Sequence, residues 1–140
     1  MHLAAADQLA HKRALVRDAF AGYVSLAGLD VMVEPADPPL AYRTRVKWMA
    51  AGGKLGMYAR GGGHEVVDTP ECRVASPLLL SVASAVRQRS ARLPLAAVDL
   101  REALTPDGPR ALVTLVTKSA AREAQAIARE LLATSGVAGT

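Results

Sequence analysis

Three basic residues alternate with other residue types in one segment of the sequence. Arg43, Arg45 and Lys47 are separated by single residues, and Tyr58 and Arg60 follow within the same stretch lacking Asp and Glu. Successive side chains of a β-strand point to opposite faces, so the three alternating cations share a face if the segment is a strand. Such a row can bind nucleic-acid phosphates, and a nearby tyrosine ring can stack on a base.

A two-residue turn predicts how this segment pairs. Gly52-Gly53 fits the tight hairpin turns whose central residues adopt positive φ. If Ala51 faces Lys54 across this turn, Arg45 faces Arg60. The predicted core face then consists of Val46, Trp48, Leu55 and Met57. The predicted polar face consists of Arg43, Arg45, Lys47, Tyr58 and Arg60, with Gly56 leaving room above the backbone.

Two interpretations of the polar face remain open. An ordinary solvated hairpin also displays Arg and Lys, and the charge pattern alone slightly favours this interpretation. Like charges opposite each other destabilise a strand pair, however, and a bound polyanion such as RNA would remove that cost. The pattern therefore indicates an RNA-binding face without establishing one.

Patterns typical of catalysis or metal binding are weak. His64 stands beside Glu65 and close to Asp68, but a turn histidine on a solvated strand is the simpler interpretation. The three histidines have no ligand spacing with Cys72, the single cysteine, and the sequence contains neither a phosphate-binding loop nor a Ser–His–Asp order. Three later polar residues are interpreted as an exposed strand face without a site: Asp99, Arg101 and Glu102.

Hydrophobic periodicity predicts further elements before and after the hairpin. Apolar residues at helical spacing predict an amphipathic helix from Ala4 to Ala21, and Leu29 to Val33 is predicted as a strand before a proline-rich connector. Glu65 to Asp68 is predicted as another strand. Ser76 and Pro77 fit the N-cap and first position of a second helix. Its predicted buried side is Leu79, Val82 and Val86.

This second helix ends in a basic run of Arg87, Arg89 and Arg92. Cations complement the partial negative charge at a helix C-terminus, by ~0.3–1 kcal/mol each. We favour this interpretation over a second RNA contact.

The last part of the sequence predicts two strands and a third helix. Ala97 to Leu104 and Arg110 to Thr117 flank a strong turn signal, and the second of these strands is apolar on both faces, which predicts that both are covered. Ser119 is predicted to cap a helix that ends at Gly136. Its apolar stripe is Ala124, Ile127, Ala128 and Leu131. The whole pattern predicts a single α+β domain, with an antiparallel or mixed sheet and helices packed on one side.

Composition excludes several classes of protein. The 140 residues are 51% hydrophobic, which is enough for one core. Apolar runs fall short of the ~20 residues of a transmembrane helix, so no membrane association is predicted. A single cysteine excludes an internal disulfide and suits a reducing cytoplasm. The net charge of +4 is compatible with an RNA partner but does not identify one.

Several blocks of the sequence, in order, resemble the RNA uracil-5-methyltransferases, which methylate uridine in tRNA and ribosomal RNA using S-adenosylmethionine. The blocks are YRTRV from Tyr42, LGMYARGGGHEVVD from Leu55, and PEC ending at Cys72. QLAHKRALVRDAF before them and AVDLREALTPDGPRALVTLV after them also resemble family segments. The resemblance extends from about Leu3 to Leu132.

The family enzymes often combine an N-terminal RNA-binding barrel, a central domain and a C-terminal methyltransferase domain, and the resemblance is to the central part. It implies that residues 1–140 are the RNA-recognition domain, with the barrel and the methyltransferase domain absent. The parent would be a cytoplasmic enzyme using S-adenosylmethionine, whereas this chain lacks the cofactor-binding turn and the nucleophilic cysteine. The implied partners are tRNA or rRNA and the catalytic domain of the same polypeptide.

Cys72 has two interpretations. From its residue type alone, it is a small buried hydrophobe. In many members of the resembling family, four cysteines hold a 4Fe–4S cluster, and Cys72 falls on the fourth position while the other three would precede His2. One thiolate cannot hold a four-cysteine cluster. The resemblance therefore implies an orphan iron–sulfur ligand, and no cofactor is expected in this chain.

Two other functions remain alternatives to a methyltransferase domain. One is a stand-alone RNA-binding module without catalytic activity. The other is a protein-interaction domain whose hairpin is merely basic, for which RNA binding would be absent or insensitive to salt.

Overall fold

The computed structural model describes residues 3–90, 93–118 and 122–139. The chain divides into two compact units, residues 1–39 and 40–140. The sheet and two of the three α-helices of the described residues lie in the second unit, and each unit is described separately. Within the described ranges, no helix has both the length and the apolar character that crossing a bilayer requires.

The first unit contains helix α1 (Ala5–Phe20) and a short 3-10 helix, η1 (Val24–Leu26). The predicted helix is thus confirmed to within one residue at each end, although none of its residues is buried. The predicted strand from Leu29 to Val33 is wrong, because this segment forms no strand and pairs with no other described segment. Its apolar composition suits a strand, but a strand needs a hydrogen-bonding neighbour.

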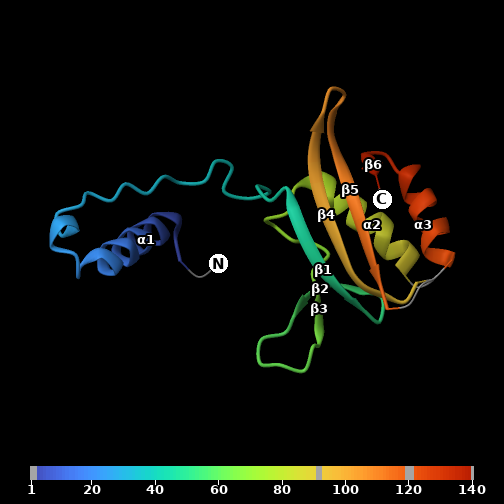
Figure 1. Ribbon diagram of the computed structural model, residues 1–140, viewed down its shortest axis with the longest axis horizontal. Coiled ribbons are helices and arrows are strands. Elements are labelled where there is room, and N and C mark those ends of the chain that lie inside the picture. The colour runs from blue at the N-terminus through green and yellow to red at the C-terminus, as the bar shows by residue number, and fades with distance from the viewer. Residues whose placement is uncertain (1–2, 91–92, 119–121, 140) are drawn as a thin grey trace. The chain divides into compact units, whose positions relative to one another are not determined.

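The second unit is a six-stranded sheet with two helices (Figure 1). Its elements are β1 (Arg45–Ala51), β2 (Lys54–Tyr58), β3 (Val66–Asp68), α2 (Pro77–Ser90), β4 (Leu95–Thr105), β5 (Gly108–Thr117), α3 (Arg122–Leu132) and β6 (Val137–Gly139). The strand order is β3-β2-β1-β4-β5-β6, and every pair is antiparallel except β5 with β6. The predicted α+β class with a mixed sheet is confirmed.

The predicted hairpin forms, with one correction at its glycine. Gly52 and Gly53 adopt φ of 55° and 78°, and Ala51 pairs with Lys54 as predicted. Gly56 does not leave room above the backbone. A Cβ atom there would overlap the carbonyl oxygen of Val67, because β3 crosses close to this position. Glycine is therefore required by the close approach of two backbones.

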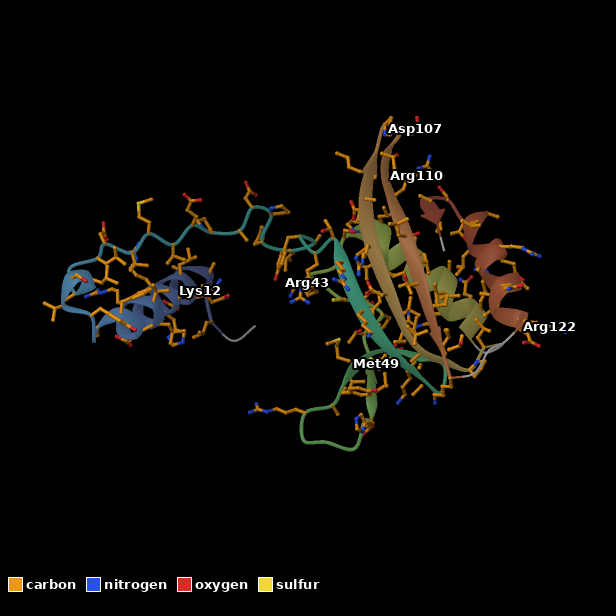
Figure 2. The ribbon with its side chains drawn as sticks, viewed as in Figure 1. Lys12, Arg43, Met49, Asp107, Arg110 and Arg122 are labelled. Atoms are coloured by element: carbon orange, nitrogen blue, oxygen red, sulfur yellow. The ribbon has the colours of Figure 1, made fainter. Side chains whose placement is uncertain are left out.

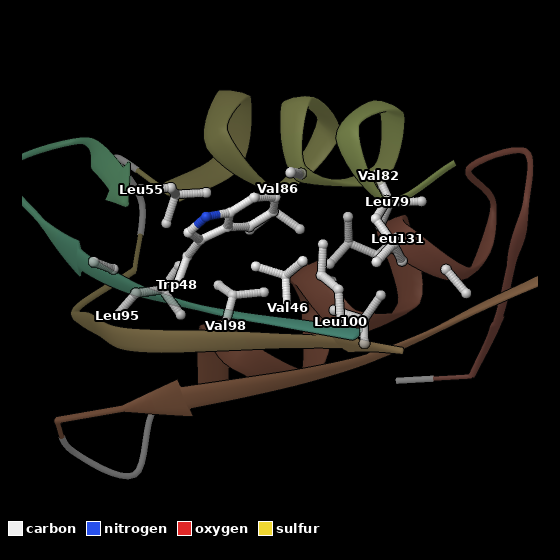
Figure 3. Packing of buried hydrophobic residues seen from close by; sticks show 14 of the residues in the cluster. Val46, Trp48, Leu55, Leu79, Val82, Val86, Leu95, Val98, Leu100 and Leu131 are labelled. Atoms are coloured by element: carbon white, nitrogen blue, oxygen red, sulfur yellow. The ribbon is translucent and has the colours of Figure 1, made fainter. Parts of the chain in front are cut away.

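The core lies between one face of the sheet and the two helices (Figure 3). Trp48 is 2% exposed, and it packs with side chains of α2 and α3 in a single cluster. Nearly every side chain predicted to be in the core is buried: Val46, Trp48, Leu55, Leu79, Val82, Val86, Ile127 and Leu131. Met57 is 54% exposed where β2 nears its end, and Ala124 and Ala128 of the predicted stripe are partly buried.

Local sequence signals were predicted at the start of α2 and at both ends of α3. The N–H of Leu79 donates to the Ser76 hydroxyl at 3.3 Å, which confirms the predicted N-cap of α2. The helix α3 ends at Leu132, earlier than the predicted end at Gly136, and Gly136 has φ of 88° in the turn that follows. The predicted cap Ser119 lies outside the described residues. The strand β6 that follows was not predicted, and the N–H of Ala111 in β5 donates to the Gly136 carbonyl at 2.6 Å beside it.

The prediction that β5 is covered on both faces is wrong. Val113 is buried beneath the helices, whereas Leu112 and Val116 on the opposite face are exposed. Among the described residues of this unit, α2 and α3 are the only α-helices, and both pack on the same face. The other face of β1, β4 and β5 is therefore not covered by a helix of this unit, and we refer to it as the open face.

Candidate nucleic-acid interface

The open face of the sheet gathers cations from β1 and β4. These strands are antiparallel, with Arg45 opposite Arg101 and Lys47 opposite Asp99. Directly opposed residues share a face, with Cβ atoms ~4.5–5.5 Å apart. Four neighbouring positions thus hold three cations and one carboxylate. We refer to Arg45, Lys47, Asp99 and Arg101 as the basic sheet cluster.

Asp99 holds the two arginines of the cluster. Arg45 Nη2 donates to Oδ2 of Asp99 at 2.8 Å, and Arg45 Nε donates to Oδ1 at 3.3 Å. The two residues therefore form a bidentate ion pair. Arg101 Nε lies 3.6 Å from the same Oδ1. The exposed fractions of the side chains are 58% for Arg45, 54% for Arg101 and 14% for Asp99. The carboxylate is thus sheltered beneath two solvent-facing guanidinium groups.

These contacts fix the charge of the carboxylate. The hydrogen bond from Arg45 lowers the pKa of Asp99 below its ordinary value of 3.8, and this effect outweighs burial, which acts in the opposite direction; the charges of Arg45 and Arg101 lower it further. In return, the hydrogen bond to Asp99 raises the pKa of Arg45. Asp99 therefore stays ionised, and its ion pair with Arg45 persists, throughout the neutral range.

The structure brings only some of the predicted site residues together. Arg45 and Lys47 lie in the cluster, and Arg43 lies just before β1, exposed, with its backbone bonded to Val74 and Ser76. Arg60 does not face Arg45. Strand β2 ends two residues before Arg60, which is exposed in the loop that follows. The like-charged neighbour of Arg45 is instead Arg101.

Tyr58 and His64 form a separate aromatic pair at the far end of β2. Their ring centroids are 4.9 Å apart and their planes meet at 87°. His64 adopts φ of 53° after three glycines that also have positive φ. His64 and Asp68 do not form a catalytic pair. The Asp68 carboxylate instead accepts hydrogen bonds from the Leu55 N–H at 3.0 Å and from Arg87 at 2.8 Å.

The basic end of α2 has structural partners. Arg87 binds Asp68 and also donates to the Leu55 carbonyl at 3.3 Å. Arg89 donates to Glu130 at 3.2 Å and to the Ala85 carbonyl at 2.8 Å. These contacts tie α2 to β2, β3 and α3, so they favour a structural role for both arginines. Arg92 lies outside the described residues.

Sequence reasoning missed Arg101 and Asp99, which were interpreted as an exposed face without a site. Their alternation with Val98 and Leu100 does place them on the polar side of a strand. The decisive fact is that β4 pairs with β1, which joins Asp99 to Arg45 across 54 positions of sequence. No local signal carries that pairing. The alternation of polar and apolar residues in both strands was the available hint.

The described residues do not fit an iron–sulfur cluster. Cys72 is partly buried and packs against the core, and it is the single cysteine of the sequence. In the described parts of the chain, no group of three or more His, Cys, Asp or Glu side chains is arranged to hold a metal ion. The arrangement supports the interpretation of Cys72 as a small core residue.

Comparison with solved structures identifies the fold. The structure superposes on the crystal structure of Pyrococcus abyssi tRNA (uracil-54, C5)-methyltransferase in complex with S-adenosyl-L-homocysteine, with a TM-score of 0.66 over 86% of this chain. The chain has the fold of part of that methyltransferase. Sequence identity is 20%, and the match spans 31% of the methyltransferase chain. No family model and no curated protein matches the sequence.

The resemblance inferred from the sequence is thus confirmed at the level of the fold. This fold presents its basic sheet cluster on the face opposite α2 and α3. Exposed arginines and a lysine on a sheet face can bind the phosphate groups of single-stranded or folded nucleic acid. Arg and Lys contacts to phosphate do not depend on the base sequence.

Proposed function

We propose that this chain is the RNA-holding central domain of an S-adenosylmethionine-dependent RNA uracil-5-methyltransferase. The observation that carries the proposal is the basic sheet cluster on the open face of a methyltransferase-like fold. The chain's own contribution would be to bind tRNA or rRNA through phosphates and to orient it. Methyl transfer to uridine would be performed by a catalytic domain of the same polypeptide, in the cytoplasm.

The geometry supports a binding role in three ways. The cations of the cluster are exposed, so phosphates can reach them without any rearrangement of the core. They stand on paired strands, which fix their spacing more firmly than a loop would. The face around them is not covered by either helix of the unit. A rigid basic surface of this kind positions an RNA backbone while leaving the choice of uridine to other contacts.

The test is a measurement of RNA affinity across a salt series, using a folded tRNA and a ribosomal RNA hairpin. The variant Arg45→Ala/Lys47→Ala should bind more weakly, and the slope of log affinity against log salt should flatten by ~1–2, because two phosphate contacts are lost. Arg122→Ala/Arg129→Ala is the matched control, since it removes the same charge from exposed positions on α3.

Equal losses in the two variants would show that only net charge matters and would contradict the assignment of the sheet face. Absence of binding by the parent chain, even at low salt, would reject the RNA-holding role. That result would favour the basic protein-interaction domain, for which the exposed Leu112 and Val116 beside the cluster provide apolar contact area.

A further inference from the structure

Arg45 and Arg101 converge on one carboxylate from two neighbouring strands. They are direct cross-strand partners, and each directs its guanidinium group toward Asp99, with the closest N–O distances at 2.8 Å and 3.6 Å. Lys47 stands directly opposite Asp99 on β1. One small anionic group, with two oxygens in a plane, thus pairs with two solvent-facing guanidinium groups, and a lysine occupies the opposing strand position.

A phosphodiester group offers the same recognition elements as this carboxylate. It carries one negative charge and two terminal oxygens, and the guanidinium fork matches carboxylate and phosphate alike. Both guanidinium groups face solvent, and ion pairs of exposed side chains contribute little to stability, so little is lost when the arginines exchange Asp99 for another anion. A phosphate arriving from solvent can therefore replace Asp99 as the main partner of the two arginines.

We propose that Arg45 and Arg101 form a clamp for a single backbone phosphate of RNA, and that Asp99 is its internal competitor. Asp99 holds the two side chains in position while the clamp is empty, and its charge weakens binding when a phosphate enters. This inference rests on the proposed RNA-holding function and names the group that the site takes. It assigns roles to Asp99 and Arg101.

Two other arginine–carboxylate pairs among the described residues, Arg87–Asp68 and Arg89–Glu130, lack these properties. Arg87 and Arg89 are each 25% exposed, and both also donate to backbone carbonyl groups of their surroundings. In each of those pairs the contacts join separate elements of the fold. The Asp99 site differs because two arginines share one carboxylate and both face solvent.

The deciding variant is Asp99→Asn, which removes the charge but keeps an oxygen that can accept from Arg45. The probe is a six-residue oligouridylate, titrated into the full chain at low salt. We expect affinity to rise about fivefold, the effect of removing one unit charge ~4 Å from the phosphate in a water-like medium. In the parent, the side-chain Nε–Hε NMR signals of Arg45 and Arg101 should shift together on titration.

Asp107→Asn is the matched control, because it removes the same charge from an exposed position in the β4–β5 turn (Figure 2). Arg101→Lys is the second variant, which keeps the charge but loses the fork, and it should weaken binding several-fold. It keeps the test decisive if Asp99→Asn fails to fold. Similar gains for both Asn variants, or unchanged affinity in Arg101→Lys, would overturn the clamp.

The two proposals fail in different ways. If oligouridylate shifts the arginine signals but the chain binds neither tRNA nor the rRNA hairpin, the phosphate clamp is supported and the RNA-holding function is rejected. If the folded RNAs bind and neither arginine signal shifts, the RNA-holding function is supported and the phosphate clamp is rejected.

Discussion

The hydroxyl group of Ser76 joins the first turn of α2 to strand β4. It donates a hydrogen bond to Oε2 of Glu102 at 2.5 Å and accepts one from the N–H of Leu79 at 3.3 Å. Ser76 is buried, and Glu102 is partly buried. One side chain therefore caps the helix and satisfies a carboxylate from the sheet that carries the basic cluster.

Replacing Ser76 by Ala should lower the free energy of unfolding by ~1–2 kcal/mol, because a capping bond is lost and Glu102 is left without this donor. Urea denaturation monitored by Trp48 fluorescence measures the change. Ser81→Ala, at an exposed position of the same helix, should have little effect. A Ser76→Ala protein as stable as the parent would contradict the capping role.

Trp48 should be the most costly single truncation of the sheet's core face. It is 2% exposed and packs within the main hydrophobic cluster. Trp48→Ala should destabilise the second unit by ~3–5 kcal/mol, since a large cavity replaces the ring. Circular dichroism in a urea series can follow it without the fluorophore. Met57→Ala, at a neighbouring exposed position, serves as control, and a comparable loss there would argue against selective burial of Trp48.

Gly56 should tolerate no side chain. A Cβ atom would overlap the Val67 carbonyl oxygen, and the obstacle is backbone, which a rotamer change does not relieve. Gly56→Ala should cost ~3 kcal/mol, the upper end of overpacking effects, and should loosen β3 from β2. Amide hydrogen exchange of β3 measures the loosening. Gly28→Ala meets nothing within 4 Å and should be nearly neutral. Unchanged exchange in β3 would refute the close approach.

Stability should fall in acid partly through Asp68. Burial raises the pKa of this carboxyl, but hydrogen bonds from the Leu55 N–H and from Arg87, with the charge of Arg87, lower it overall below 3.8. A lowered folded-state pKa stabilises the fold above the unfolded-state value, and this contribution disappears as pH falls through the folded-state value. In Asp68→Asn, the decline in unfolding free energy between about pH 5 and pH 2 should be shallower. An unchanged acid profile would exclude this contribution.

Local signals in the sequence predicted the local structure well. They could not predict which strands pair when the strands are far apart in the sequence. Gly52-Gly53 and Ser76 specify a turn and a cap through their own backbone and side-chain chemistry, so both features are confirmed. Leu29 to Val33 has the composition of a strand, yet strand formation depends on a partner that composition does not reveal. The three-residue β6 is too short to show any period.

The candidate site was predicted on one strand and missed on the other for the same reason. Alternation placed Arg45 and Lys47 on one face, as the structure has it. The hairpin register then suggested Arg60 as the neighbour of Arg45, because β2 was the only partner that sequence proximity offered. The strand β4, which pairs with the other edge of β1, supplies Asp99 and Arg101. The carboxylate of Asp99 offsets the repulsion that was expected between two opposed arginines.

The pairing of β6 with β5 has a consequence for how the protein is made. Ala111 in β5 finds its edge partners, Gly136 and Val137, only after α3 has been translated. At ~5–20 residues per second, a ribosome needs about 1–5 s to travel from one to the other. During that interval the nascent sheet exposes an unpaired edge, the kind of surface that pairs with other chains. Slower translation over α3 should therefore increase misassembly of the nascent chain.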